Sequence, residues 1–189
     1  DDFLSTCVLL AALPGATVHR HEPSREELDD PDVYVVDVGM EYDPEKHNFD
    51  HHQDERLPCG FHLVMQHLGY HEAARKVYLW YQHLNMIDLR GADKTAEHLG
   101  IDTDILYTTS SPIEGYILSR FAAVTELCPG DFLYNLMQDL GRDKLDLIDM
   151  KNRRLDQLKT ETRIASVNGH KVLLSPIAEN PKLSLELYL

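Results

Sequence analysis

The stretch from Val33 to Gln53, VYVVDVGMEYDPEKHNFDHHQ, places the strongest constraint on how this chain can fold. It begins with a short apolar run rich in β-branched residues, which is typical of a strand buried on both faces, as in a parallel sheet. The run ends on Asp37, and a polar loop leads from there to Asp50, His51 and His52. Ligands of open α/β sheets bind beyond the carboxyl ends of the strands. Asp37 is therefore expected at the edge of the sheet where a site would form.

The side chains of this stretch suit a pair of divalent metal ions. A buried carboxylate needs a partner, and a metal ion, an arginine or a helix N-terminus could serve Asp37. The tandem of His51 and His52 directly after an acid favours a metal, and mixed carboxylate and imidazole ligands suit manganese, iron or zinc better than calcium. Two metal ions about 3.5–4 Å apart can generate hydroxide and clamp both oxygens of a phosphoryl displacement. The stretch therefore predicts a dinuclear centre for phosphoester chemistry.

The remaining chain predicts an α/β fold with a smaller C-terminal segment. With 189 residues, 43% of them hydrophobic, the chain can bury a core. Apolar residues at helical spacing predict helices over residues 2–13, 61–68, 72–89, 92–99, 112–127, 131–140 and 143–160. Asn168-Gly169 between two apolar stretches predicts a hairpin over residues 164–176. We expect a mostly parallel sheet flanked by helices in a catalytic domain over 1–128, and an accessory helical and hairpin segment over 129–189.

The charge and the cysteines limit the partners and the compartment. A net charge of −14 argues against a broad grip on a long nucleic-acid backbone, but allows phosphorylated small molecules and short RNA or DNA. The widely spaced Cys7, Cys59 and Cys128 form no CxxC pair, so neither disulfides nor a thiolate zinc site is expected. No apolar run approaches the roughly 20 residues that span a bilayer. We expect a cytoplasmic protein without a membrane partner, leave a homo-oligomer open, and expect residues upstream of Asp1 to be missing.

Two motifs of the stretch resemble those of a known superfamily. VVDVG followed by DHH resembles motifs II and III of the DHH phosphoesterases, which include family II inorganic pyrophosphatases, nanoRNases and RecJ-type exonucleases. The longer run DVGMEYDPEKHNFDHHQ is most similar to the melanocyte-proliferating-gene family of DHH-like proteins. This resemblance covers the stretch strongly and the flanking helices only in pattern. It implies a DHH-type domain and an activity that leans towards a 3′–5′ exonuclease on RNA.

The resemblance also implies the metal ligands. Asp37 would bridge two ions, while Asp1 and His51 would each bind one. A further acid is assigned to Asp88, which could equally be a helix-end acid paired with Arg90. The expected cofactor is two Mn²⁺ ions, with Mg²⁺, Fe²⁺ or Zn²⁺ as alternatives. The histidine-rich segment that precedes Asp1 in the family is absent here, which leaves one metal position incomplete.

The residues around the ligands have expected supporting roles. By the same resemblance, Asp50 would position the histidines and His52 would contact phosphate. Arg90 could also contact substrate phosphate, and His47, close to the histidine pair, would support the site or its loop. The catalytic residues are then expected to be Asp37, His51 and His52.

The expected function is a metal-dependent, nuclease-like phosphoesterase that acts on short oligonucleotides or nucleotides through metal-activated water. One alternative is a non-catalytic DHH-like scaffold or partner-binding protein, and a weaker one is a metal-dependent amide or protein hydrolase. The sequence contains no GxxxxGK[ST], no GxGxxG after a strand and no GxSxG. Nucleotide-cofactor chemistry and serine hydrolysis therefore have no support.

Overall fold

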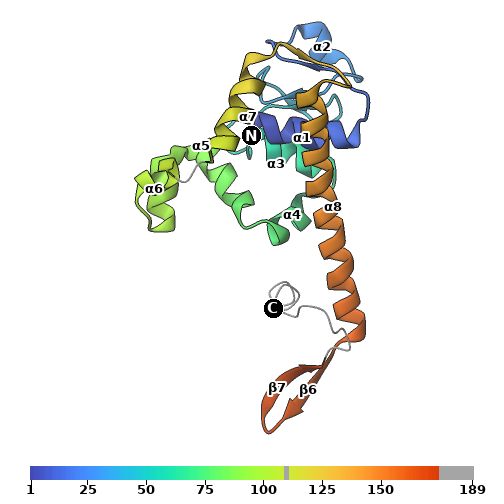
Figure 1. Cartoon of the computed structure of the whole chain (residues 1–189), viewed down its shortest axis with the longest axis vertical. Helices are drawn as coiled ribbons and strands as arrows, with labels where there is room; N and C mark the ends of the chain where they lie inside the picture. The colour runs from blue at the N-terminus through green and yellow to red at the C-terminus, as the bar shows by residue number, and fades with distance from the viewer. Residues whose placement is uncertain (109–110, 175–189) are drawn as a thin grey trace.

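The computed structural model describes residues 1–108 and 111–174, which form mainly helices together with small sheets (Figure 1). The helices are α1 (Asp2–Ala12), α2 (Arg25–Asp29), α3 (Gly60–His67), α4 (His71–Val77), α5 (Trp80–Leu99), α6 (Thr103–Thr108), α7 (Pro112–Ala123) and α8 (Phe132–Glu161). The strands are β1 (Val18–His19), β2 (Val35–Val36), β3 (Tyr42–Asp43), β4 (Asn48–Phe49), β5 (Glu126–Leu127), β6 (Arg163–Val167) and β7 (His170–Leu174). Among these helices, none has the length and apolar character needed to cross a membrane.

The sheet that carries the stretch 33–53 is small and mixed. Its strand order is β2-β4-β3, with β2 parallel to β4 and β3 antiparallel to β4. The expected strand over 33–38 is short because the backbone turns left-handed at Asp37 (φ 59°), Gly39 and Met40. Asp37 still donates its backbone N–H to the Phe49 carbonyl at 3.2 Å, which ties it to the end of β4. A mostly parallel sheet stays a prediction, since β2–β4 is the parallel pair in the described part of the chain.

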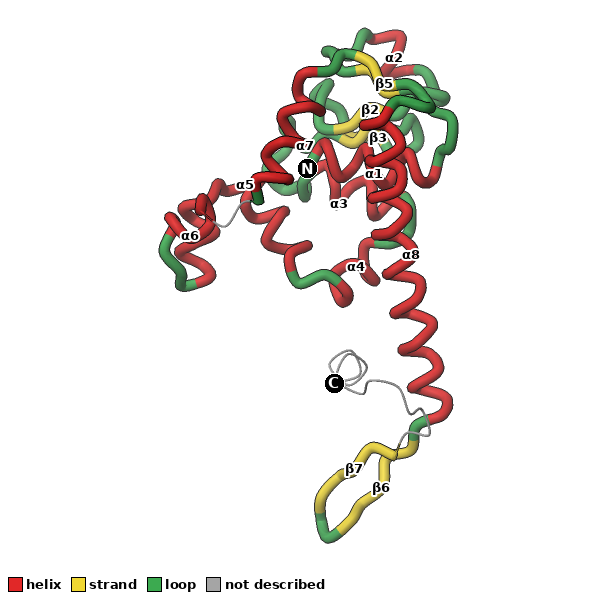
Figure 2. The backbone as a smooth tube through the Cα atoms, viewed as in Figure 1, coloured by secondary structure: helices red, strands yellow, loops and turns green. Residues whose placement is uncertain are grey.

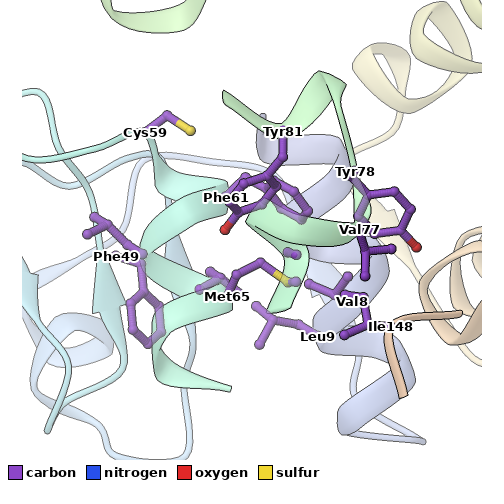
Figure 3. Packing of buried hydrophobic residues seen from close by; sticks show 13 residues of the cluster. Val8, Leu9, Phe49, Cys59, Phe61, Met65, Val77, Tyr78, Tyr81 and Ile148 are labelled. Carbon is purple, nitrogen blue, oxygen red and sulfur yellow. The ribbon is translucent and has the colours of Figure 1, made fainter. Parts of the chain in front are cut away.

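A core of buried side chains from α1, α3, α4, α5 and α8 lies beside this sheet (Figure 3). Val8 and Leu9 of α1 meet Met65 of α3 and Ile148 of α8 in one apolar cluster. Helices α1 and α8 approach each other very closely. A Cβ atom added to Gly141 would overlap the backbone carbonyl of Cys7, so the two helices pack in direct backbone contact there.

Three helix predictions were wrong. The helix expected over 112–127 ends at Ala123, and β5 (Glu126–Leu127) follows it; packing explains the other two errors. The single helix expected over 72–89 is broken at Tyr78, whose extended backbone lets its buried ring donate a hydroxyl hydrogen bond to the Lys144 carbonyl at 2.7 Å. The third error concerns the helices expected over 131–140 and 143–160. They form one continuous helix, α8, because Gly141 serves the contact with α1 rather than ending a helix.

The C-terminal half of α8 extends away from the core and carries the hairpin β6–β7 (Figure 2). The expected turn is present: Asn168 (φ 51°) and Gly169 (φ 83°) both have the positive φ values of a type I′ turn. The end of the predicted hairpin, residues 175 and 176, lies outside the described residues. The division at residue 128 stays a prediction, and the first half of α8 packs against α1.

The buried His62 on α3 makes the fold sensitive to acid. Its ring stacks on Tyr81, and its Nε2–H donates to the Tyr81 carbonyl at 3.0 Å. Burial lowers the pKa of His62 from an ordinary value near 6.5 to about 4. The unfolded chain therefore binds more protons than the folded chain between these values. The free energy of unfolding should consequently fall as the pH drops from about 6.5 to 4, by about 3 kcal/mol.

This prediction can be checked by chemical denaturation across that pH range, in the presence of a chelator. Asp37 changes the free energy of unfolding in the opposite direction. Its pKa is raised to about 6, so its ionisation lowers the stability of the fold as the pH rises. To isolate the effect of His62, the free energy of unfolding should be compared across this pH range between the native chain and His62→Gln. The variant should lose the acid sensitivity that His62 contributes. His98→Gln, on an exposed position of α5, is the control. Equal pH profiles for His62→Gln and the native chain would contradict the assignment.

Candidate metal centre

Residues from separate parts of the chain meet at the carboxyl ends of β2 and β4. Asp37 follows β2, His51 follows β4, and Asp88 comes from α5. The Nε2 atom of His51 lies 3.3 Å from Oδ1 of Asp37 and 3.1 Å from Oδ2 of Asp88. The predicted convergence of these three side chains is thus present in the structure.

Two atoms in this group are buried and have no hydrogen-bond partner among the residues that the structure describes. These are Oδ1 of Asp37 and Nε2 of His51, and the His51 side chain is only 7% exposed. Buried polar atoms without a partner cost free energy and are rare in folded proteins. A carboxylate oxygen and an imidazole nitrogen that converge in this way are suitable first-row metal ligands. The arrangement therefore fits a divalent cation held between Asp37, His51 and Asp88.

A second group of potential ligands adjoins the first. Ligand atoms of Asp1, Cys59 and Asp88 lie within 4.8 Å of one another, so Asp88 borders both groups. The start of α3 comes close to these carboxylates, and the Phe61 backbone N–H donates to Oδ2 of Asp1 at 3.3 Å. A Cβ on Gly60 would lie 3.2 Å from the same oxygen, so the absence of a side chain there permits this approach. The two groups are therefore neighbouring candidate metal positions.

The protonation states in the first group suit metal binding. Burial and the charge of Asp88 raise the pKa of Asp37 to about 6. Burial also lowers the pKa of His51 below its ordinary value, which keeps the imidazole neutral. Metal ions bind the neutral imidazole and the ionised carboxylate. A bound cation would relieve the repulsion between Asp37 and Asp88 that the metal-free chain carries.

Asp50 holds the loop of the site rather than joining the ligands. It is 1% exposed and accepts hydrogen bonds from the Met40 backbone N–H at 2.6 Å, the His52 backbone N–H at 3.1 Å and His52 Nδ1 at 2.6 Å. Burial by itself would raise the pKa of Asp50, but the bonds from His52 and Met40 outweigh it and lower the pKa. In return, the hydrogen bond to Asp50 raises the pKa of His52, whose side chain is 54% exposed. His52 therefore presents an oriented imidazole to solvent beside the ligands.

His47 and Arg90 lie around the centre in different ways. His47 stacks on Tyr34 at a ring distance of 4.1 Å, and its Nδ1 pairs with the Pro31 carbonyl at 2.8 Å, which braces the strand that leads to Asp37. Arg90 is exposed on α5, two residues beyond Asp88, and no described ion pair joins the two. The expected Asp88–Arg90 pair is therefore not part of the described structure.

Cys59 is the residue that the sequence interpretation did not place at the site. The thiol is fully buried, and burial raises its pKa to about 12. Its position directly before Gly60 and a helix start was visible in the sequence. Only the folded chain shows that this helix start meets Asp1 and Asp88.

Comparison with known proteins supports the resemblance over the first third of the chain. Residues 1–67 match the model of a family described as MYG1_exonuc, Uncharacterised protein family (UPF0160). This match agrees with the resemblance to the melanocyte-proliferating-gene family. It includes Asp1, Asp37 and the Asp50-His51-His52 triplet, and it ends before Asp88. Neither the curated proteins nor the solved structures contain a match to the chain.

Proposed function

We propose that the chain carries the metal centre of a metal-dependent phosphoesterase of nuclease-like type. The observation that carries this proposal is the facing pair of buried, unpartnered atoms, Asp37 Oδ1 and His51 Nε2, with Asp88 beside them. The family match over residues 1–67 supports it, because the printed name of that family contains an exonuclease designation. The mixed oxygen and nitrogen ligands support it further, since this combination suits ions used in phosphoryl transfer.

Two divalent ions, preferably Mn²⁺, would be held by Asp1, Asp37, His51 and Asp88. When bound, such ions supply Lewis acidity at phosphate oxygens and lower the pKa of water. Asp37 would serve both positions, because it lies 3.3 Å from Nε2 of His51 and, like Asp1, it borders Gly60. Asp88, on α5, would also contribute to both positions, because it borders both ligand groups.

His52 is suited to bind the substrate phosphate. Its Nδ1–H donates to the buried Asp50 carboxylate, which leaves Nε2 for a contact outside the protein. Because Asp50 also raises the pKa of His52, the cationic imidazolium is favoured, and it attracts a phosphate oxygen. Arg90 provides an exposed second cation two residues beyond Asp88. With a net charge of −14, the chain should prefer short oligonucleotides or nucleotides over long nucleic acid.

The direct test is hydrolysis of a short RNA carrying a label at its 5′ end. With Mn²⁺ present, we expect stepwise shortening from the 3′ end with release of mononucleotides, and we expect a chelator to stop it. Parallel assays with a short DNA, a nucleotide phosphoester and a peptide distinguish the substrate classes. Metal-dependent cleavage of the peptide alone would replace the proposal with an amide hydrolase. No turnover on any substrate, despite bound metal, would favour a scaffold role.

A further inference from the structure

Cys59 occupies a position that apolar packing alone does not explain. The residue is fully buried at the start of α3, and Figure 3 shows it at the periphery of the apolar cluster, away from the side chains around Met65. Its sulfur lies within 4.8 Å of carboxylate oxygens from Asp1 and Asp88. Cys59 belongs to the apolar cluster, but its sulfur also comes close to two acids, which apolar packing does not require.

The position of Cys59 relative to Asp88 is fixed by a hydrogen bond. The Cys59 backbone N–H donates to Oδ1 of Asn85 at 2.8 Å. Asn85 lies on α5 three residues before Asp88, so both residues are on one face of that helix. The bond therefore holds the start of α3 against the part of α5 that provides the Asp88 carboxylate.

A separate observation comes from the neighbouring residue His51. Nε2 of His51 is buried and unpartnered, and it points at Oδ2 of Asp88 from 3.1 Å. The Asp88 carboxylate thus lies between the unpartnered Nε2 atom of His51 and the thiol of Cys59. With two neighbouring cations, one would bind Nε2 of His51, and the other would bind the Cys59 thiolate at the Asp1–Asp88 position.

We propose that Cys59 is a sulfur ligand of the Asp1–Asp88 position and makes this position selective for a thiophilic divalent cation. Soft thiolate ligands favour Zn²⁺ or Co²⁺ over Mn²⁺ and Mg²⁺. The inference rests on the proposed metal centre and refines which ions it holds. Binding breaks the S–H bond, forms a metal–sulfur bond and releases one proton to solvent. The centre would then be asymmetric, with an oxygen and nitrogen position beside a position that includes sulfur.

Co²⁺ is the probe that tests this directly, because thiolate coordination gives a near-ultraviolet charge-transfer band separate from the visible bands of the ion. The experiment uses the full 189-residue chain and the double variant Cys7→Ala, Cys128→Ser, in which Cys59 is the remaining cysteine. We expect the charge-transfer band in both proteins, and we expect its loss in Cys59→Ser. Competition should also show the Zn²⁺ preference over Mn²⁺ falling at least about tenfold in Cys59→Ser.

X-ray absorption at the zinc edge on the native chain provides a measurement that needs no variant to fold. A sulfur neighbour of Zn²⁺ would support the proposal. Visible Co²⁺ bands without a charge-transfer band, together with only oxygen and nitrogen neighbours of Zn²⁺, would overturn the role of Cys59 and leave the metal centre standing. Failure of Co²⁺ and Zn²⁺ to bind at all would overturn the role of Cys59 together with the metal centre.

Discussion

Replacing Asp37 with asparagine is expected to lower the rate of Mn²⁺-dependent phosphodiester hydrolysis by more than about 100-fold. Loss of a residue that only supports a metal ligand costs up to about 100-fold, and loss of a ligand itself should cost more. Asp37 supplies a buried oxygen that faces His51 and accepts no hydrogen bond within the described part of the chain. Asparagine is the informative substitution because it tolerates the left-handed backbone that Asp37 adopts at φ 59°. The substitution therefore removes the negative charge with little change to the backbone.

The same variant should fold at least as stably as the native chain when metal is chelated. The raised pKa of Asp37, about 6, means that its charge disfavours the folded state at neutral pH. The control is Asp54→Asn, which removes an acid from the loop between β4 and α3, where its partner is the exposed Arg56. Hydrolysis rates and thermal unfolding should be measured for both variants. Near-native activity in Asp37→Asn, or equal losses in both variants, would contradict the role of Asp37.

The substitution Gly141→Ala is expected to lower the free energy of unfolding by about 3 kcal/mol or more. The added methyl group would overlap the backbone carbonyl of Cys7, so α1 and α8 would have to separate. Overpacking costs typically reach about 3 kcal/mol, and here the obstacle is backbone rather than a flexible side chain. Because Asp1 lies at the start of α1, the displacement should also weaken metal binding at the Asp1–Asp88 position.

Gly115→Ala is the matched control for this prediction. Gly115 also lies within a helix, α7, but apart from that helix's own neighbouring backbone no described atom lies within 4 Å of the methyl group that would be added. Alanine should therefore stabilise the chain there by about 0.5–1 kcal/mol, since it loses less conformational freedom on folding than glycine. Urea denaturation of the two variants should give shifts of opposite sign. A loss below about 1 kcal/mol in Gly141→Ala would show that α1 and α8 are not in close contact.

The local part of the site could be predicted from the sequence because its residues are close in the chain. Asp37 and the Asp50-His51-His52 triplet lie at the ends of paired strands, and one short sheet brings them together. Asp88 was assigned through resemblance alone. Its approach depends on the break at Tyr78, which redirects α5, and that break follows from a hydrogen bond to a residue far away in the chain.

The parts that could not be predicted depend on packing between distant helices. Helix α8 is continuous because Gly141 lies in the contact with Cys7. From the local sequence alone, a glycine between two amphipathic stretches predicts a helix end. Cys59 was missed for the same reason, because its neighbours Asp1 and Asp88 come from other helices. Spacing of ligand residues along the chain carries no signal for such a contact.

The central claim is that Asp37, His51 and Asp88 form a divalent metal site, and anomalous diffraction from crystals soaked in Mn²⁺ tests it most directly. We predict an anomalous peak between Asp37 and His51, in contact with both side chains and with Asp88. A soak that includes a phosphate analogue should place its oxygens between this peak and His52. Saturating Mn²⁺ with no anomalous peak at these residues would contradict the proposed metal site.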